Sequence, residues 1–298
     1  MELTPYHPFR SAEARDQYLV EYDRRAQRWP VPSETRLVAT SYGQTFVRVS
    51  GPADAPPLVL LHGTPANSLM WQPMVATLSA HHRVYAVDTI WDIGRSVYTR
   101  PLRRPMDYLN WLDGLFTALA PTTAIHLMGM SHGGWLTGLY AARFPKRVAK
   151  AVLLSPSGTV RRLRMTWLIC AIGSGLRRSW GESFKNWMFK DSLRLGPDAR
   201  QLVDEIMHDG AQWMRILLRT KMVPPTVLMD KELQGLPMPV LVLIGEHEKI
   251  YSPKKALRRL HKVAPNIKAE LIPQAGHDLV LAQAELVNRK VSDFLNQP

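Results

Sequence analysis

A serine flanked by two glycines follows a short apolar run near the middle of the chain. The run 124–128 leads into Gly129-Met130-Ser131-His132-Gly133, which is a G-x-S-x-G pattern. In a tight turn from a strand into a helix, this pattern holds the serine in a strained backbone conformation with its hydroxyl projecting. The two glycines are required there because a Cβ at either position would collide across the turn. The pattern predicts that Ser131 is a nucleophile, with an ordinary strand-to-helix turn as the alternative.

A serine hydroxyl becomes a useful nucleophile only when a base removes its proton and an acid orients that base. The predicted base is His277, which lies in a loop next to Gly276 just beyond the last apolar run. The predicted acid is Glu248, on the loop after the run 240–244, and Glu246 on the same loop is the reserve. A carboxylate on this loop could reach the histidine loop that follows the next strand.

Backbone N–H groups must also receive the negative charge that develops on the substrate oxygen during attack. One predicted donor is the amide of His132, which follows the nucleophile and begins a helix whose dipole adds positive potential. The other is the amide of Thr64, in the loop His62-Gly63-Thr64-Pro65 after the run 58–61. The side chains of His62 and His132 are expected to be structural or bystander groups rather than catalytic bases.

Short apolar runs and helical patterns alternate along most of the chain. Strands are predicted at 35–40, 45–50, 58–61, 84–87, 125–128, 151–154, 240–244 and 269–272, with the first two joined as a hairpin through 41–44. Helical patterns are found at 10–28, 106–119 and 135–143. This alternation predicts an α/β fold with a mostly parallel sheet and helices on both faces.

The alternation stops between residues 156 and 236, where the sequence predicts helices and no clear strand. We expect a core formed by 1–155 and 237–298, with 156–236 inserted as a helical cap over the carboxyl ends of the strands, where substrates bind in open α/β sheets. Basic and aromatic residues are frequent between 161 and 194. The favoured interpretation is a lid over a pocket, and a weak contact with an anionic membrane surface is the alternative. No nucleic-acid motif accompanies the charge, so nucleic acid is not an expected partner.

The composition is typical of a globular protein. A reducing cytoplasm is the expected compartment. The chain has 298 residues, of which 46% are hydrophobic, and a formal net charge of +13. No apolar run approaches the ~20 residues of a membrane span, and no signal peptide is expected from the first residues. The single cysteine, Cys170, can form no internal disulfide and is expected to be a buried structural thiol.

Together these landmarks resemble the α/β-hydrolase superfamily. Besides the serine turn, the matching positions are His62-Gly63, Asp88 with Gly94 and Ser96, Gly245 to Glu248, and Gly276-His277. The chain order of the nucleophile, acid and base also agrees with the family order. The resemblance implies an eight-stranded sheet with a cap after strand six, a Ser-Glu-His triad and no cofactor. Within the superfamily, the chain is similar to capped bacterial carboxylesterases.

Two positions depart from the family pattern. Glu248 stands where Asp is usual, and the loop 88–96 is longer and less glycine-rich than usual, which would reshape the pocket wall. The related haloalkane dehalogenases and epoxide hydrolases look similar around 62–65 but use Asp as the nucleophile, so Ser131 argues against both activities.

The residues and the resemblance together predict a serine hydrolase that cleaves small-molecule carboxylic esters through an acyl-enzyme intermediate. Two other functions remain open. The same triad could act on a lactone, an amide or a C–C bond, or with peroxide as the acceptor. The scaffold could also serve as a non-catalytic ligand-binding protein, because a fold does not imply a function.

Overall fold

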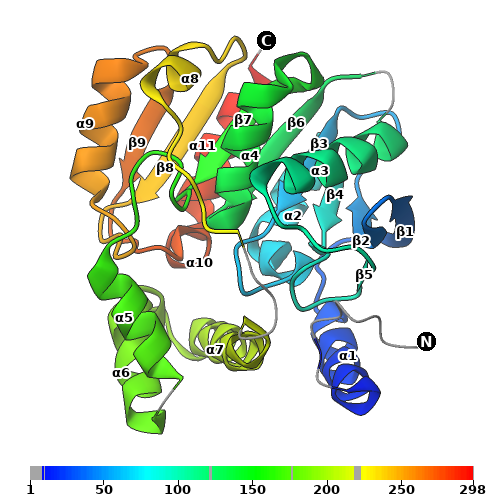
Figure 1. Cartoon of the computed structure of the whole chain (residues 1–298), viewed down its shortest axis with the longest axis vertical. Coiled ribbons are helices and arrows are strands. Elements are labelled where there is room, and N and C mark those ends of the chain that lie inside the picture. The colour runs from blue at the N-terminus through cyan, green and yellow to red at the C-terminus, as the bar shows by residue number, and fades with distance from the viewer. Residues whose placement is uncertain (1–8, 10, 121–122, 176, 218–222, 298) are drawn as a thin grey trace.

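A nine-stranded sheet forms the centre of the protein (Figure 1). The computed structural model describes residues 9, 11–120, 123–175, 177–217 and 223–297. The strands are β1 (Glu34–Thr40), β2 (Gly43–Ser50), β3 (Pro57–Leu61), β4 (Arg83–Val87), β5 (Val97–Tyr98), β6 (Ile125–Met130), β7 (Val148–Leu154), β8 (Val240–Gly245) and β9 (Lys268–Ile272). Their order is β1-β2-β4-β3-β6-β7-β8-β9, with β5 paired to β2. All pairs from β4 to β9 along this path are parallel, whereas β2 pairs antiparallel with β1, β4 and β5.

This sheet confirms the predicted α/β class and the eight predicted strands, which form its main path. The hairpin is also confirmed, because Thr40 pairs with Gly43 across the turn between β1 and β2. The ninth strand, β5, was not predicted. It has only two residues, which are too few to show the alternation that identifies a strand from sequence.

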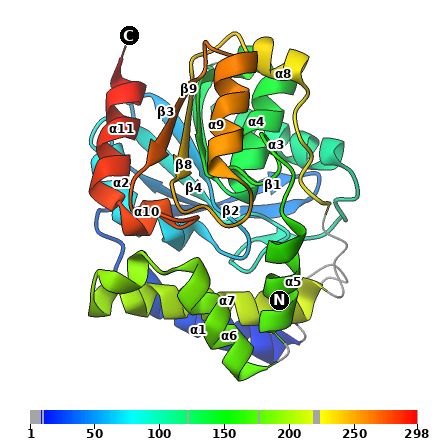
Figure 2. The same cartoon turned by 90° about the vertical axis from the view of Figure 1, so that its left-hand side faces the viewer.

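Helices cover both faces of the sheet (Figures 1 and 2). They include α2 (Gln72–Ser79), α3 (Pro105–Leu119), α4 (His132–Arg143), α9 (Pro253–Val263), α10 (Leu279–Ala282) and α11 (Ala284–Asn296). Successive strand residues point to opposite faces. Val59 and Leu61 on β3 therefore belong to the core cluster that includes residues of α3, α4 and α9, whereas Leu58 and Leu60 belong to the cluster that includes residues of α2 and α11. All four side chains are fully buried. β3 therefore lies between two hydrophobic cores, one on each face of the sheet.

The segment between β7 and β8 is helical. It contains α5 (Met165–Ser174), α6 (Arg178–Met188), the 3-10 helix η3 (Ser192–Arg194), α7 (Pro197–Leu217) and α8 (Asp230–Gln234), and no strand among its described residues. Helices α5, α6 and α7 lie below the end of the sheet at which α10 follows β9 (Figure 2). They therefore face the carboxyl ends of the parallel strands.

An N-terminal helix, α1 (Ala12–Ala26), joins the core to α7. On one side, the hydroxyl of Tyr22 donates to Oδ1 of Asp88 at 3.3 Å. On the other, Nη1 of Arg25 donates to both carboxylate oxygens of Asp209 on α7, at 3.0 and 2.9 Å. The two paired side chains are only 7% and 8% exposed. Such a buried pair fixes the relative position of two helices because separating it would leave an unpaired buried charge.

The expectation for Cys170 is wrong, because this cysteine is exposed. It lies on α5, a helix in which no residue is buried. An apolar neighbourhood in the sequence suggested burial, but most side chains of α5, including that of Cys170, are exposed. Among the described residues, no helix is both long enough and apolar enough to cross a membrane.

Candidate active site

Ser131 occupies a strained turn between β6 and α4. Its φ of 53° lies in the left-handed region, which residues other than glycine adopt rarely and at a cost. The neighbouring glycines make the turn possible. A Cβ at Gly129 would lie 2.2 Å from the carbonyl oxygen of Gly133, and a Cβ at Gly133 would lie 2.1 Å from that of Leu61. The structure thus gives Ser131 the backbone conformation that the G-x-S-x-G pattern predicts.

His277 and Glu248 lie together at the carboxyl ends of β8 and β9. Nδ1 of His277 is 2.8 Å from Oε2 of Glu248, and Oε1 of Glu248 accepts a hydrogen bond from the amide of Ile250 at 2.8 Å. Glu248 is 3% exposed. Burial opposes its ionisation, but the charge and hydrogen bond of His277, together with the hydrogen bond from the amide of Ile250, favour it, and the pKa of Glu248 lies below its usual value. An ionised Glu248 can orient the imidazole and stabilise its protonated form.

Glu246, the reserve acid, lies elsewhere on the same loop. Its Oε2 accepts a hydrogen bond from the amide of Gln274 at 3.3 Å and lies 4.0 Å from Nε2 of His247. Its side chain is 46% exposed. The geometry therefore favours Glu248 over Glu246 as the partner of His277.

The hydroxyl of Ser131 has a serine neighbour that the sequence analysis did not single out. Oγ of Ser157 lies 2.9 Å from Oγ of Ser131, and the amide of Ser157 donates to the carbonyl oxygen of Ser131 at 3.0 Å. Within the described part of the chain, no hydrogen bond joins Ser131 to His277. Hydrogen bonds between catalytic groups are often long or absent before substrate binds.

The loop after β3 passes close to Ser131. A Cβ at Gly63 would lie 3.1 Å from Cβ of Ser131, so glycine permits this approach. The next residue, Thr64, is followed by a cis bond to Pro65. Among the described residues, the backbone amides of Thr64 and His132 donate no hydrogen bond to another protein group. Both predicted donors are thus available on residues adjacent to the site.

The two histidines beside Ser131 have the structural character expected from the sequence. Nδ1 of His62 lies 2.7 Å from the carbonyl oxygen of Gly63, and its Nε2 accepts from the amide of Thr89 at 3.0 Å. The ring of His132 packs edge-on against Trp91 and Trp135. Burial lowers the pKa of His132 to about 3, so this ring is neutral and too weakly basic to be the base at neutral pH.

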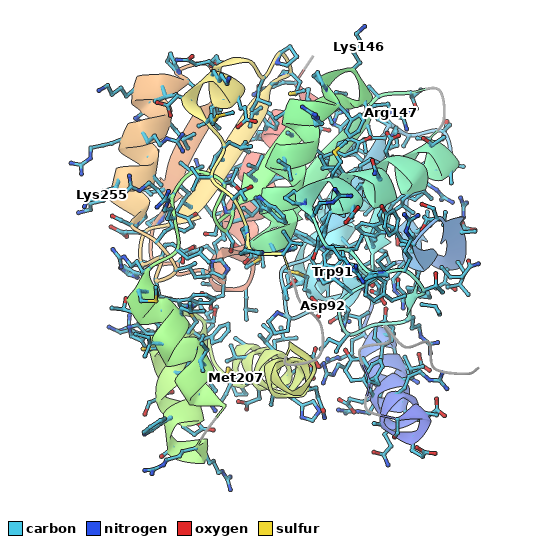
Figure 3. The ribbon with its side chains drawn as sticks, in the orientation of Figure 1. Trp91, Asp92, Lys146, Arg147, Met207 and Lys255 are labelled. Atoms are coloured by element: carbon cyan, nitrogen blue, oxygen red, sulfur yellow. The ribbon has the colours of Figure 1, made fainter. Side chains whose placement is uncertain are left out.

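The loop 88–96 contributes a second buried carboxyl group that the sequence analysis missed. Asp92 is 1% exposed, and burial raises its pKa to about 8. Its Oδ1 accepts from the amide of Ile93 at 2.9 Å, whereas its Oδ2 has no partner among the described residues. Trp91 and Asp92 lie on the part of the core that faces α7, the helix that carries Met207 (Figure 3). The only signal in the sequence was an acidic residue in an unusually long loop.

These groups form the set that nucleophilic acyl transfer requires. The loops after β3, β6, β8 and β9 supply these groups. They are a strained serine, a histidine bonded to a buried carboxylate, and two available amides. In parallel sheets these loops gather at one edge. The arrangement can therefore generate a nucleophile and stabilise an oxyanion.

Known proteins match almost the whole chain. The sequence model of the Alpha/beta hydrolase family matches residues 58–290. Carboxylesterase YbfK of Bacillus subtilis (strain 168) is 36% identical over 291 residues, which cover 96% of each protein. The protein named Uncharacterized carboxylesterase nap, from the same strain, is 38% identical over 283 residues, or 94% of this chain and 92% of nap.

Solved structures show the same similarity in three dimensions. The crystal structure of carboxylesterase CesB (YbfK) from Bacillus subtilis superposes with a TM-score of 0.86 at 34% identity, covering 96% of this chain and 99% of that one. Naproxen esterase (carboxylesterase NP) from Bacillus subtilis gives a TM-score of 0.83 at 35% identity, covering 96% and 99%. Because so little of the chain is left uncovered, the match extends into the helical segment between β7 and β8.

Proposed function

The chain belongs to the alpha/beta hydrolase family, and from this premise we propose that it hydrolyses carboxylic esters through an acyl-enzyme formed on Ser131. The observation that carries the proposal is the 2.8 Å contact between His277 and the buried carboxylate of Glu248, at the same sheet edge as a strained serine. Relatives named carboxylesterase, at 36% and 38% identity over nearly the full chain, support the same reaction.

In the proposed reaction, Ser131 is the nucleophile and His277 is the general base. Nε2 of His277 takes the proton of the Ser131 hydroxyl as its oxygen attacks the ester carbonyl carbon. The imidazolium then gives this proton to the leaving alcohol, so that the C–O bond breaks and the acyl group remains on Ser131. A water molecule, deprotonated by His277, then attacks the acyl-enzyme. The imidazolium returns this proton to Oγ of Ser131 as the bond to the acyl group breaks and the acid leaves.

Glu248 would act by holding His277 rather than by taking its proton. The Nδ1–H group of His277 donates to Oε2 of Glu248, so Nε2 is left free to accept the proton of Ser131. Glu248 also stabilises the imidazolium that forms during attack. A second hydrogen bond, from the amide of Ile250 to Oε1, keeps the longer Glu side chain in one position.

The amides of Thr64 and His132 would stabilise the oxyanion. Thr64 directly follows Gly63, which lies close to Ser131. His132 is the next residue after Ser131 in the chain. The His132 amide also opens α4, whose N-terminal dipole favours a negative charge at this point. Donors of this kind contribute on the order of 3 kcal/mol each to the barrier.

We further propose that residues 156–236 form a cap domain on a core made of 1–155 and 237–298. Its helices lie over the carboxyl ends of the strands (Figure 2), so they would shape the pocket and select the ester. The proposed compartment is the cytoplasm, consistent with the single cysteine. The proposed partner is a small-molecule ester, with a weak contact between the basic cap and an anionic membrane surface as a second proposed interaction.

Hydrolysis of p-nitrophenyl acetate, butyrate and octanoate by the wild type and Ser131→Ala tests the proposal. We expect turnover of at least one ester and a loss of at least about 10³-fold in the variant, because triad members act as a unit. Equal activity of the two proteins would contradict the mechanism. If the folded wild type hydrolysed lactones or amides much faster than esters, that substrate class would replace esters in the proposed function.

A fluorophosphonate probe separates a specialised enzyme from a binding protein. If no ester is hydrolysed, labelling of the wild type but not of Ser131→Ala would show an active nucleophile that needs another substrate. Absence of labelling in a folded wild type would favour the non-catalytic function and contradict the proposal.

A further inference from the structure

Helix α5 presents a row of apolar side chains to solvent. Met165, Leu168, Ile169 and Ile172 are 68%, 41%, 63% and 49% exposed. Their spacing of three, four and seven residues places them on one face of the helix. A helix that packs on a core buries its apolar face, whereas the apolar face of α5 is exposed to solvent.

The opposite face of α5 holds the helix to the rest of the protein. Trp167 and Ala171 lie there and are half-buried, and Trp167 packs against the larger core cluster. Because this face is already used for attachment, the apolar row must point away from the molecule. In Figures 1 and 2, α5 and α6 extend beyond the end of the sheet, so the row lies at an extremity of the protein.

Arginines stand at both ends of the apolar row. Three precede α5 and two follow it: Arg161, Arg162, Arg164, Arg177 and Arg178. All five are exposed, and none forms a salt bridge with a described acidic residue. The guanidinium of Arg177 lies 5.2 Å from the ring centre of Trp180, which is itself 47% exposed.

We propose that α5 lies flat on an anionic phospholipid surface. The row of Met165, Leu168, Ile169 and Ile172 would enter the boundary between headgroups and acyl chains, as the apolar face of an interfacial helix does. The flanking arginines would bind lipid phosphates, which guanidinium groups recognise well. Trp180 would lie at headgroup level, where amphipathic aromatic rings are favoured.

The positive charge beside α5 favours an anionic lipid surface over a second copy of the chain as the partner. An apolar row alone would fit either, but two copies meeting at α5 would bring ten unpaired arginines together, in a protein whose net charge is already +13. An anionic bilayer neutralises the same charges. This binding is a property of the surface and does not depend on the proposed ester hydrolysis.

Co-sedimentation of the full chain with two kinds of vesicle tests the inference. One is pure phosphatidylcholine and the other contains about one-third phosphatidylglycerol, both in about 0.1 M salt so that only nearby charges act. We expect at least tenfold stronger binding to the anionic vesicles. Equal binding to both kinds, or none to either, would overturn the proposal.

Matched variants separate the surface of α5 from general charge and hydrophobicity. Ile169→Glu should weaken binding at least tenfold, whereas Leu37→Glu, at a residue that is 56% exposed on β1, should change it less than threefold. Arg161→Gln with Arg162→Gln should weaken binding about 25-fold, from about fivefold for each charge near the surface. Arg143→Gln with Lys146→Gln removes the same charge at the other end of the molecule, where Lys146 lies (Figure 3), and should leave binding within threefold.

Two outcomes of these variants would contradict the inference. Equal losses for both charge pairs would mean that net charge, not α5, attracts the vesicles. A dimer in analytical ultracentrifugation that Ile169→Glu converts to a monomer, together with no lipid binding, would show that the row joins two copies. Circular dichroism of each variant establishes that it is folded.

Discussion

Nδ1 of His277 lies 2.8 Å from Oε2 of Glu248, although the two residues are 29 positions apart in the chain. The contact follows from the topology, because β8 and β9 are parallel neighbours and the loops after them leave the sheet side by side. Glycine permits this approach. A Cβ at Gly245 would lie 1.9 Å from the carbonyl oxygen of Gly276. The sheet therefore brings the proposed acid and base together before any substrate binds.

Replacing Glu248 by Gln tests the role of this contact. Gln keeps the size of the side chain but can donate to Nδ1, which would favour the wrong tautomer of His277. We expect kcat for p-nitrophenyl butyrate to fall by about 10³- to 10⁴-fold, as for loss of a triad carboxylate. Glu246→Gln is the matched control and should change kcat less than threefold. A large loss for Glu246→Gln and a small one for Glu248→Gln would reverse the assignment.

The hydroxyl pair Ser131 and Ser157 gives a second prediction. In the free protein the hydroxyls of Ser131 and Ser157 form a hydrogen bond in which either can be the donor. If Ser131 donates, this bond breaks when Ser131 donates to His277 instead. A neutral hydrogen bond contributes about 1 kcal/mol. We expect Ser157→Ala to leave kcat/KM unchanged or raise it by up to about fivefold. A hundredfold loss would instead show that Ser157 is part of the catalytic machinery.

Asp92 should make the stability of the protein depend on pH. Burial raises its pKa from 3.8 to about 8 in the folded protein, so the folded state keeps a proton that the unfolded chain releases. The stability that this group contributes is complete below about pH 4 and is lost as the pH rises to about 8.

Asp92→Asn removes this titration while keeping the shape of the side chain. The variant should gain stability relative to the wild type as the pH rises from 5 to 8, by at least about 1 kcal/mol. Urea denaturation of both proteins at the two pH values measures the difference. A difference that stays constant with pH would contradict the predicted protonation of Asp92.

The buried pair Arg25 and Asp209 should anchor α7 to α1. Arg25→Met leaves Asp209 buried without its partner, so we expect a loss of about 3–5 kcal/mol in the free energy of unfolding. Adding Asp209→Leu should restore most of it. Arg24→Met, which breaks an exposed pair with Glu21, should cost less than about 1 kcal/mol. Equal losses for Arg24→Met and Arg25→Met in urea denaturation would show that the buried pair has no special role.

Much of the fold was predictable because its central parallel strands, such as β3 and β8, are continuous apolar runs. All eight predicted strands are present, with ends that differ by three residues or fewer. A buried parallel strand needs no partner-specific signal beyond such a run. The two-residue β5 and the outward face of α5 were not predictable in this way. Whether an apolar helix residue such as Cys170 is covered depends on neighbours that the local sequence does not contain.

The candidate site was predictable where the backbone constrains the sequence. The glycines beside Ser131 and His277 mark tight turns and close approaches, which are visible in a single sequence. The choice of Glu248 over Glu246 depends on the direction in which each side chain leaves the loop. Ser157 and Asp92 were missed because their importance comes from contacts with residues distant in the chain or from burial.

The most direct test of the proposed function is to locate the covalent intermediate. The protein is mixed with p-nitrophenyl butyrate, quenched in acid within milliseconds and mapped by mass spectrometry after trypsin digestion. Arg143, Lys146 and Lys150 separate Ser131 from Ser157 in the sequence, so the two serines fall on different peptides. We predict a butyryl group on the peptide that contains Ser131. A butyryl group on the Ser157 peptide, or steady hydrolysis with no acylated peptide, would contradict the mechanism.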